Sequence, residues 1–435
     1  MMAVLHGRGG ANGVQLHTHE WFGDKLEYFE FPDGWRLSTQ HMKGYMAPVL
    51  SPSEIQRAVQ NPAGTKPLRE LATGKRTVTI AFDDLTRPTP TYAVVPHVMA
   101  ELHAAGIRDE DVLFVAAYGS HHPMNGIEVA KKLGQEAVFR YSWINHNCWQ
   151  NLTDLGTTKA RNQLWVSSFF LRSDLKITLS GVKAHPDSAG YSGGPKLVLP
   201  GICGISTIRY MHEVIPRPAR EKRSDGTEII HVWQNERHQD MIDAARKVGI
   251  DFSVQIVYNQ DRQPVCIVAG DVVKAHHQAC RYAVNHLATE TARPSDVVVV
   301  NVYPKGQHVQ EHLMWGLQGL KDGGSVVVVN QSPMGEAAMC YLWEAGFDQG
   351  APWLNLRNGR KRRFPMARQV LIYSQYLQKR ELDHPFFPPE AIGVRRWSEV
   401  IERLKREHKG DVDVAIYPYA GIQQPLATLD LPEDA

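Results

Sequence analysis

The chain has 435 residues, which is enough for two or three domains and too many for one ordinary core. Hydrophobic residues make up 43% and charged residues 22%, as in a soluble globular protein, and the formal net charge of +2 argues against a nucleic-acid-binding surface. The five cysteines are scattered without a C-x-x-C pair, so neither a zinc ribbon nor a disulfide framework is indicated. No apolar leader or membrane span is evident, and we expect a cytoplasmic location without a membrane partner.

The first part of the chain contains two local signals. The stretch "LEYFEFPDGWRLST" predicts a β-hairpin that turns at Pro32-Asp33-Gly34. The stretch "SPSEIQRAV" then predicts a helix with Ser51 as N-cap and Glu54 closing a capping box.

A repeated theme follows, in which an apolar, β-branched run ends in a polar loop. The runs "RTVTIAF", "DVLFVAAY" and "LKITLS" lead into "DDLTRPTP", "GSHHPM" and "GVKAHPDSAGYSGG". Runs without polar alternation are typical of strands that are buried on both faces of a parallel sheet. Ligands bind beyond the carboxyl ends of such strands, so we expect the three loops to meet at one edge.

A second series of apolar runs predicts another parallel sheet: "SDVVVVNV", "GSVVVVNQ", "RQVLIYS" and "DVDVAIY". We therefore expect an α/β protein with two α/β domains, mainly parallel sheets and the active site in the cleft between them. The predicted domains are residues 1–275, which would bind a cofactor, and residues 276–418, with a tail of about 419–435 that packs back on the first domain.

Three loops carry residues with chemical potential. Asp84 and Arg87 follow the first strand, where Arg87 could hold a carboxylate or phosphate in its planar fork. His121 follows the second strand, in a Gly-Ser-His sequence, and His185 follows the third. Each of these residues also has an ordinary structural interpretation, as a helix N-cap, a surface arginine or a packed histidine.

The third loop is rich in glycine and ends in Lys196, a composition that suggests an anion-binding hollow although no Walker A sequence is present. His212 follows in "STIRYMHEVI", where Ile208, Met211 and Ile215 predict the apolar stripe of a helix. A partly buried structural histidine is the alternative interpretation of His212.

In combination, these stretches resemble the nickel-pincer-nucleotide lactate racemase family. The matching features are "FGDKLEYFEFPDGW", "PLRELATGKRTVTIAF", "DDLTRPTP", "GSHHPMNGIE", "HPDSAGYSGGPKLVLPGICG" and His212, which cover most of the first predicted domain. The second domain matches more loosely, around "VNVYPKG".

The resemblance implies a racemase or epimerase that acts on a 2-hydroxy acid by hydride transfer. Its cofactor would be a nickel-pincer nucleotide, a pyridinium-3-thioamide-5-thiocarboxylate mononucleotide, tethered to Lys196 with His212 as nickel ligand. His121 and His185 would be the two bases, and Arg87 would contact the substrate. The remaining cofactor-binding residues implied are Asp84, Thr86, Ser192, Gly193 and Gly194. Other proteins would be needed to load the cofactor.

Two departures from the family pattern affect these expectations. The spacing from His185 to Lys196 is one residue longer than usual, so Asp187 is a second candidate for the base. In "YPKGQHVQEHLMW", Gln310, Glu311 and Met314 occupy the places of a Tyr-Gln pair and a lysine, which favours a 2-hydroxy acid other than lactate.

Two other functions remain open on the residues alone. His121, His185 and His212 could surround zinc in a metallohydrolase, although zinc sites usually add a carboxylate or a tight local pair. Alternatively, the glycine loop could belong to a nucleotide- or phosphate-binding protein without catalysis, which would leave the histidines without a role.

Overall fold

The structure is a computed structural model that describes residues 12–185, 189–217, 221–306, 315–335, 364–378, 382 and 387–433. The described chain divides into two compact units. Within the described residues, the first unit comprises those of 12–43, 289–335 and 364–425, and the second those of 44–288 and 426–433. In the described residues, no helix is long and apolar enough to cross a membrane.

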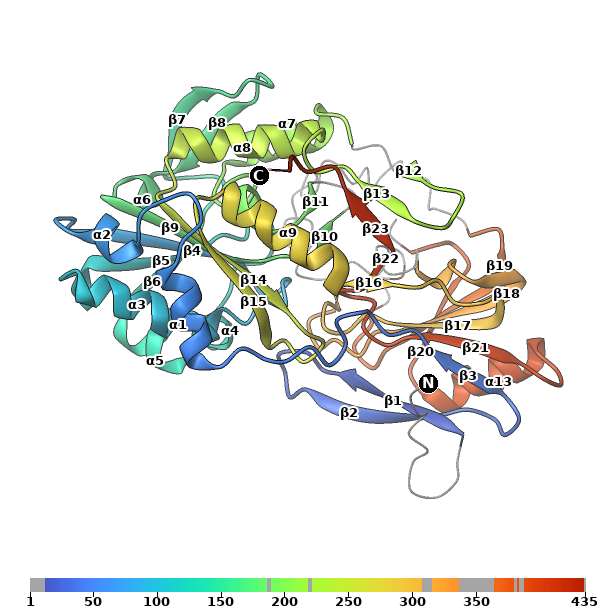
Figure 1. The fold of residues 1–435 in the computed structure, drawn as a ribbon. Helices are drawn as coiled ribbons and strands as arrows, with labels where there is room; N and C mark the ends of the chain where they lie inside the picture. Colours follow the sequence, from blue (N-terminus) through green and yellow to red (C-terminus); the bar gives the residue numbers. More distant parts are fainter. Residues whose placement is uncertain are drawn as a thin grey trace. The chain divides into compact units, whose positions relative to one another are not determined.

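The first unit is built on a six-stranded sheet in the order β20-β19-β18-β17-β21-β3, with every neighbouring pair parallel (Figure 1). Its elements are β1 (Gly13–Thr18), β2 (Lys25–Glu30), β3 (Arg36–Thr39), β17 (Ser295–Asn301), β18 (Leu320–Val329), β19 (Ala367–Tyr373), β20 (Ala391–Val394), α13 (Trp397–Glu407), β21 (Asp413–Tyr417) and β22 (Gln424–Pro425); β16 (Ala288–Thr289) lies where the chain passes between units. In β17, Val298 and Val300 join one apolar cluster while Val297 and Val299 join another. Apolar residues therefore fill both faces, as the unalternated run predicted.

The expected hairpin over residues 26–39 is wrong. β2 pairs with β1 in a separate two-stranded antiparallel sheet, while β3 pairs in parallel with β21, more than 370 residues later in the sequence. The hydrophobic pattern identified the strands correctly, but a strand pattern does not specify the partner.

The second unit contains the other six-stranded sheet, in the order β15-β14-β9-β4-β5-β6. Only the β14–β15 pair is antiparallel among these neighbours. The elements that build this sheet and its nearest helices are α1 (Pro52–Gln60), α2 (Leu68–Ala72), β4 (Val78–Phe82), α3 (Val95–Ala104), β5 (Val112–Ala116), α4 (Gly126–Leu133), α5 (Gln135–Arg140), β6 (Ser142–Asn145), β9 (Leu175–Gly181), α8 (Glu236–Val248), β14 (Phe252–Tyr258), β15 (Pro264–Gly270) and α9 (Lys274–His286). The predicted mainly parallel α/β architecture is confirmed in both units.

Smaller elements complete the second unit. They are η1 (Thr91–Ala93), η2 (Asp109–Asp111), β7 (Leu152–Thr157), β8 (Gln163–Ser167), α6 (Ser168–Leu171), β10 (Ala184–His185), β11 (Gly190–Tyr191), η3 (Gly194–Leu197), α7 (Ile205–Glu213), β12 (Glu221–Lys222), β13 (Glu228–Ile230) and β23 (Ala427–Leu429). The capping box at the start of α1 is present as predicted, with Ser51 as N-cap and Glu54 at N3. Ile208 and Met211 of α7 are buried as predicted, whereas Ile215, the third residue of the predicted stripe, is buried just beyond the end of the helix.

The division into units differs from the predicted boundaries at two points. Residues 12–43 belong with the first unit because β3 extends its sheet, whereas the sequence suggested a first domain of 1–275. The change of unit along the chain falls after residue 288. Near the C-terminus, β23 pairs in parallel with β13, so this short segment lies within the second unit.

Candidate active site

The loop after β4 holds a buried carboxylate that orients a histidine. Asp84 accepts hydrogen bonds from the backbone N–H and hydroxyl of Thr86 (2.9 and 2.5 Å) and lies 2.7 Å from Nδ1 of His121. Because a carboxylate can only accept, Nδ1 of His121 carries a proton in this pair, so Nε2 is the ring nitrogen left to exchange a proton with a ligand. Burial opposes the charge of Asp84, but the charge and hydrogen bond of His121, with the charge of Arg87, outweigh it and hold the pKa of Asp84 well below its usual range.

Arg87 lies beside this pair. Its Nη1 donates to the hydroxyl of Thr86 at 2.8 Å and to the carbonyl of Thr86 at 3.3 Å. The guanidinium is half-buried and lines the same pocket as His121. A planar cation held in this way is suited to bind a carboxylate.

A buried ion pair that the sequence patterns did not reveal fixes the conformation of this loop. Lys132 of α4 lies 2.7 Å from Asp83 and donates to the backbone carbonyls of Arg87 and Thr89, both at 3.0 Å. Asp83 also accepts from the hydroxyl of Thr89 (2.6 Å). In sequence, Lys132 stands in the pair "KK" near a helix end, which normally predicts exposed residues, so only the three-dimensional structure shows it.

The glycine loop after β9 needs its glycines for backbone conformation and close packing. Gly193 and Gly194 have φ angles of +87° and +52°. A Cβ at Gly193 would lie 2.8 Å from Oε1 of Gln255, and one at Gly194 would lie 2.5 Å from the ring of His276. No other residue type fits these positions without displacement of a neighbour.

The amides of this loop are used within the protein. The N–H of Ser192 donates to the carbonyl of Lys183 at 2.9 Å, and the N–H of Gly194 donates to Oε1 of Gln255 at 2.8 Å. The loop was expected to cradle a phosphate with such groups. These two amides have protein acceptors, so a phosphate would need other donors.

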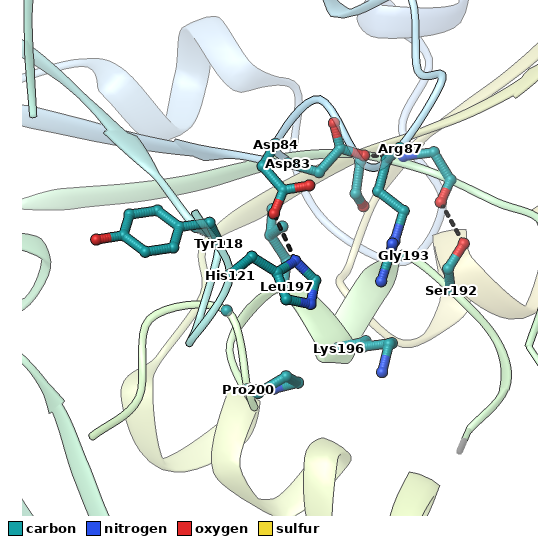
Figure 2. A pocket seen from close by; sticks show the side chains of 14 residues that line it. Asp83, Asp84, Arg87, Tyr118, His121, Ser192, Gly193, Lys196, Leu197 and Pro200 are labelled. Atoms are coloured by element: carbon teal, nitrogen blue, oxygen red, sulfur yellow. Dashed lines mark hydrogen bonds and ion pairs between the residues drawn. The ribbon is translucent and has the colours of Figure 1, made fainter. Parts of the chain in front are cut away.

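Lys196 follows the glycines on η3, which packs against α8, α9, β9 and β14. Its side chain is 9% exposed and lines the pocket with Arg87 and His121. Figure 2 shows the side chains of Lys196, Arg87 and His121 among those that line this pocket. The structure thus brings together one residue from each of the three predicted loops.

The pocket has about 420 Å³ of space free of atoms, part of it open to solvent. Its lining includes the predicted residues Asp84, Arg87, His121, Ser192, Gly193 and Lys196. Tyr118, the last residue of the predicted strand that precedes His121, also lines the pocket and was not singled out from the sequence. The expectation that the three strand-end loops meet at one edge is confirmed.

His212 lies in the last turn of α7, and its Nδ1 donates to the carbonyl of Ile208 at 2.8 Å. Burial, followed by the charge of Lys196, lowers the pKa of His212 to about 3. The ring is therefore neutral at pH 7 with its lone pair at Nε2, which is the form that binds a metal. His212 is outside the lining of the pocket, but the charges of Lys196 and His121 both act on it.

His185 is buried in β10, where it pairs with Gly190 of β11. It is not among the residues that line the pocket. Its alternative, Asp187, lies outside the described residues. In the part of the chain that is described, no group of side chains suited to share a metal combines His121, His185 and His212, which removes support from the zinc hydrolase interpretation.

Comparison with protein families matches residues 22–223 to the lactate racemase N-terminal domain. Among individual proteins, a lactate racemase of Thermoanaerobacterium thermosaccharolyticum is 29% identical over 334 residues, which cover 74% of this chain and 76% of that protein. A lactate racemase of Lactiplantibacillus plantarum is 28% identical over 284 residues, or 63% of this chain and 65% of that protein.

Two solved structures share the fold. The lactate racemase apoprotein from Thermoanaerobacterium thermosaccharolyticum aligns with a TM-score of 0.67 and 21% identity, over 95% of this chain and all of the other. A crystal structure of a Thermotoga maritima protein aligns with a TM-score of 0.61 and 16% identity, over 89% of this chain and all of the other. At these identities the likeness concerns the fold.

Proposed function

Because this chain belongs to the lactate racemase-like family, we propose that it is an isomerase that interconverts the two configurations at C2 of a 2-hydroxy acid. The observation that carries the proposal is one pocket in which Arg87, the Asp84–His121 pair and Lys196 line the walls. In such a reaction a cation can bind the carboxylate and an oriented base can take the hydroxyl proton, while a buried amine can tether a cofactor.

In this proposal, the residues of the pocket divide the work. Arg87 binds the carboxylate of the substrate through two parallel N–H donors. His121 accepts the proton of the 2-hydroxyl group at Nε2, because Nδ1 is held by Asp84. His185 would serve the opposite enantiomer, with Asp187 as the alternative.

The cofactor proposed is the nickel-pincer nucleotide, with Lys196 as the tether and His212 as the nickel ligand. Two observations support the fit of these residues to the cofactor. Lys196 lies on the pocket wall, and His212 is a neutral imidazole whose pKa is lowered in part by the charge of Lys196. When bound, the cofactor would supply an acceptor that takes hydride from C2 and returns it. Ser192, Gly193 and Gly194 support it chiefly by the shape of the loop, since two of the loop's amides have protein acceptors.

The substrate is proposed to be a 2-hydroxy acid other than lactate. The reason is the replacement of the family's Tyr-Gln pair and lysine by Gln310, Glu311 and Met314. These three residues lie outside the described part of the structure. The same proposal includes accessory proteins that load the cofactor and a cytoplasmic location.

Intact-mass spectrometry of protein co-expressed with cofactor-loading proteins tests the tether. We expect a covalent adduct of several hundred daltons on the wild type, its loss in Lys196→Ala and its retention in Lys183→Ala, a matched lysine at the other end of the loop. In His212→Ala the adduct should persist in part while nickel is lost. An adduct that survives Lys196→Ala but not Lys183→Ala would contradict the assignment.

Chiral chromatography of a panel of 2-hydroxy acids, with loaded enzyme in D₂O, tests the reaction and the substrate. Hydride return leaves protium at C2, whereas a base that removed the C2 proton would introduce solvent deuterium there. Racemisation with full deuterium incorporation would contradict hydride transfer. The highest kcat/KM for lactate would contradict the substrate proposal alone.

A further inference from the structure

Three buried histidines form a compact group behind the glycine loop. His238 stands in the first turn of α8, and His276 and His277 stand in the first turn of α9. All three are at most 1% exposed, and one ring nitrogen of each lies within 4.8 Å of those of the other two. It is the only such group of three or more His, Cys, Asp and Glu side chains in the described chain.

One nitrogen–nitrogen distance within this group matches that of two ligands of a shared metal ion. Nε2 of His238 and Nε2 of His277 are 3.2 Å apart. Two nitrogens that bind one tetrahedral zinc ion at about 2.0–2.1 Å are separated by roughly 3.3 Å. The centroids of the three rings are 5.4, 5.5 and 6.0 Å apart, and the rings are tilted relative to one another.

The hydrogen bonds leave a lone pair where a metal needs one. Nε2 of His276 lies 3.0 Å from the carbonyl of Ser192, and a carbonyl can only accept, so this nitrogen carries the proton. Nδ1 of His276 therefore holds a lone pair, and it is buried without a hydrogen-bond partner. Buried polar atoms of this kind usually have a partner, and a ligand imidazole typically donates its other N–H to a carbonyl.

The protonation states agree with this arrangement. Burial, followed by the charges of neighbouring groups, lowers the pKa of His276 to about 3 and that of His277 to about 4, and burial lowers the pKa of His238 well below its usual value. Burial therefore favours the neutral form of each of the three rings. The carboxylates of Asp271 and Asp430 act on His277, so negative charge is close by.

We propose that His238, His276 and His277 bind a zinc ion, separate from the proposed nickel ligand His212. The three-imidazole donor set suits late first-row divalent cations, and zinc accepts it in tetrahedral geometry with water in the fourth position. Cys280 is not a ligand, since its sulfur lies 3.5 Å from the protonated Nε2 of His276 and burial raises the pKa of its thiol.

The site would brace the loop that carries Lys196. His276 holds the carbonyl of Ser192, and its ring is the group that a Cβ at Gly194 would meet. The segment η3, with Lys196, packs on α8 and α9, the two helices that supply the ligands. A bound ion would link these two helices and so stabilise the conformation of the loop that packs on them.

The test uses the full chain, free of any affinity tag, expressed without cofactor-loading proteins and stripped with a chelator. Zinc is titrated in competition with a chromogenic chelator, and cobalt is used to obtain the visible spectrum of a tetrahedral site. The background is His212→Ala, so that no signal can come from the proposed nickel ligand. We expect one equivalent of tightly bound zinc and a rise in melting temperature on its addition.

Adding His277→Ala or His238→Ala to this background should weaken zinc binding by more than about 100-fold and abolish the cobalt spectrum. His146→Ala, which removes another buried neutral histidine of the same unit, should leave both unchanged, and circular dichroism checks that each variant is folded. Absence of bound zinc at micromolar concentrations in the unmutated group, or full affinity in folded His277→Ala, would overturn the proposal. Neither result bears on the racemase proposal, which depends on Lys196 and His212.

Discussion

At the scale of single residues, Asp84 and Arg87 belong to one loop but are expected to do different work. Asp84 is buried and contacts His121, so in the proposed reaction it would act by positioning the base. Arg87 contacts Thr86 through one nitrogen and lines the pocket, so it can contact the substrate directly. The two residues should therefore affect different kinetic constants.

We predict that Asp84→Asn lowers kcat by about 10²–10⁴-fold with little change in KM, because the amide neither fixes the Nδ1–H tautomer of His121 nor balances its charge. Arg87→Lys should instead raise KM most, since an ammonium cannot form the paired contacts of a guanidinium. Steady-state kinetics on cofactor-loaded enzyme, with adduct and nickel content matched, measure both. A rise in KM alone for Asp84→Asn would show that this carboxylate contacts the substrate.

At the scale of elements, the ends of the strands were the informative feature of the sequence. Apolar runs without polar alternation predicted β4, β5 and β9. Because ligands bind beyond the carboxyl ends of parallel strands, the loops after these strands were expected to meet, and Asp84, His121 and Lys196 do line one pocket. The contribution of Lys132 could not be predicted, because its helical pattern is that of an exposed lysine. The hydrogen bond of the Gly194 amide could not be predicted either, because its acceptor, Gln255, lies on a strand that follows later in the chain.

The glycine loop offers a matched test of packing against backbone strain. Gly193 and Gly226 have nearly the same φ, +87° and +86°, but a Cβ at Gly193 would meet Gln255 and Gly181, whereas one at Gly226 would meet nothing within 4 Å. We predict that Gly226→Ala costs about 1 kcal/mol, from the left-handed backbone alone. Gly193→Ala should cost about 1–3 kcal/mol more, from overpacking.

Chemical denaturation of the two variants measures this difference, and the intact-mass adduct shows whether Lys196 remains in place. Equal losses of stability in the two variants would mean that the loop moves aside at no cost. The packing argument for Gly193 would then fail.

At the scale of the whole molecule, the sequence predicted the two parallel sheets but not which strands belong to each unit. The runs around Val297–Val300 are apolar on both faces, and this composition alone specifies a covered parallel sheet. The position of β3 beside β21 depends on a pairing between residues 36–39 and 413–416, for which the local pattern contains no information. Pairings of this range are settled only by the packing of the complete unit.

Buried neutral histidines should make the second unit sensitive to acid, and His146 isolates the effect. It is 1% exposed, Nε2 donates to the carbonyl of Cys203 at 2.8 Å, and burial lowers its pKa to about 4. The unfolded chain takes up this proton below about pH 6.5 and the folded chain only near pH 4, so stability is complete above pH 6.5 and falls between these values. The free energy of unfolding changes by about 1.4 kcal/mol per pH unit for each such histidine.

We predict that His146→Gln, which retains an N–H donor, reduces the loss of stability between pH 7.5 and pH 5 by about 2 kcal/mol. Urea unfolding at both pH values, with hydrogen exchange in β5 and β6 as the readout, measures the loss of stability in the wild type and the variant. An unchanged loss in the variant would show that His146 is not the group that titrates.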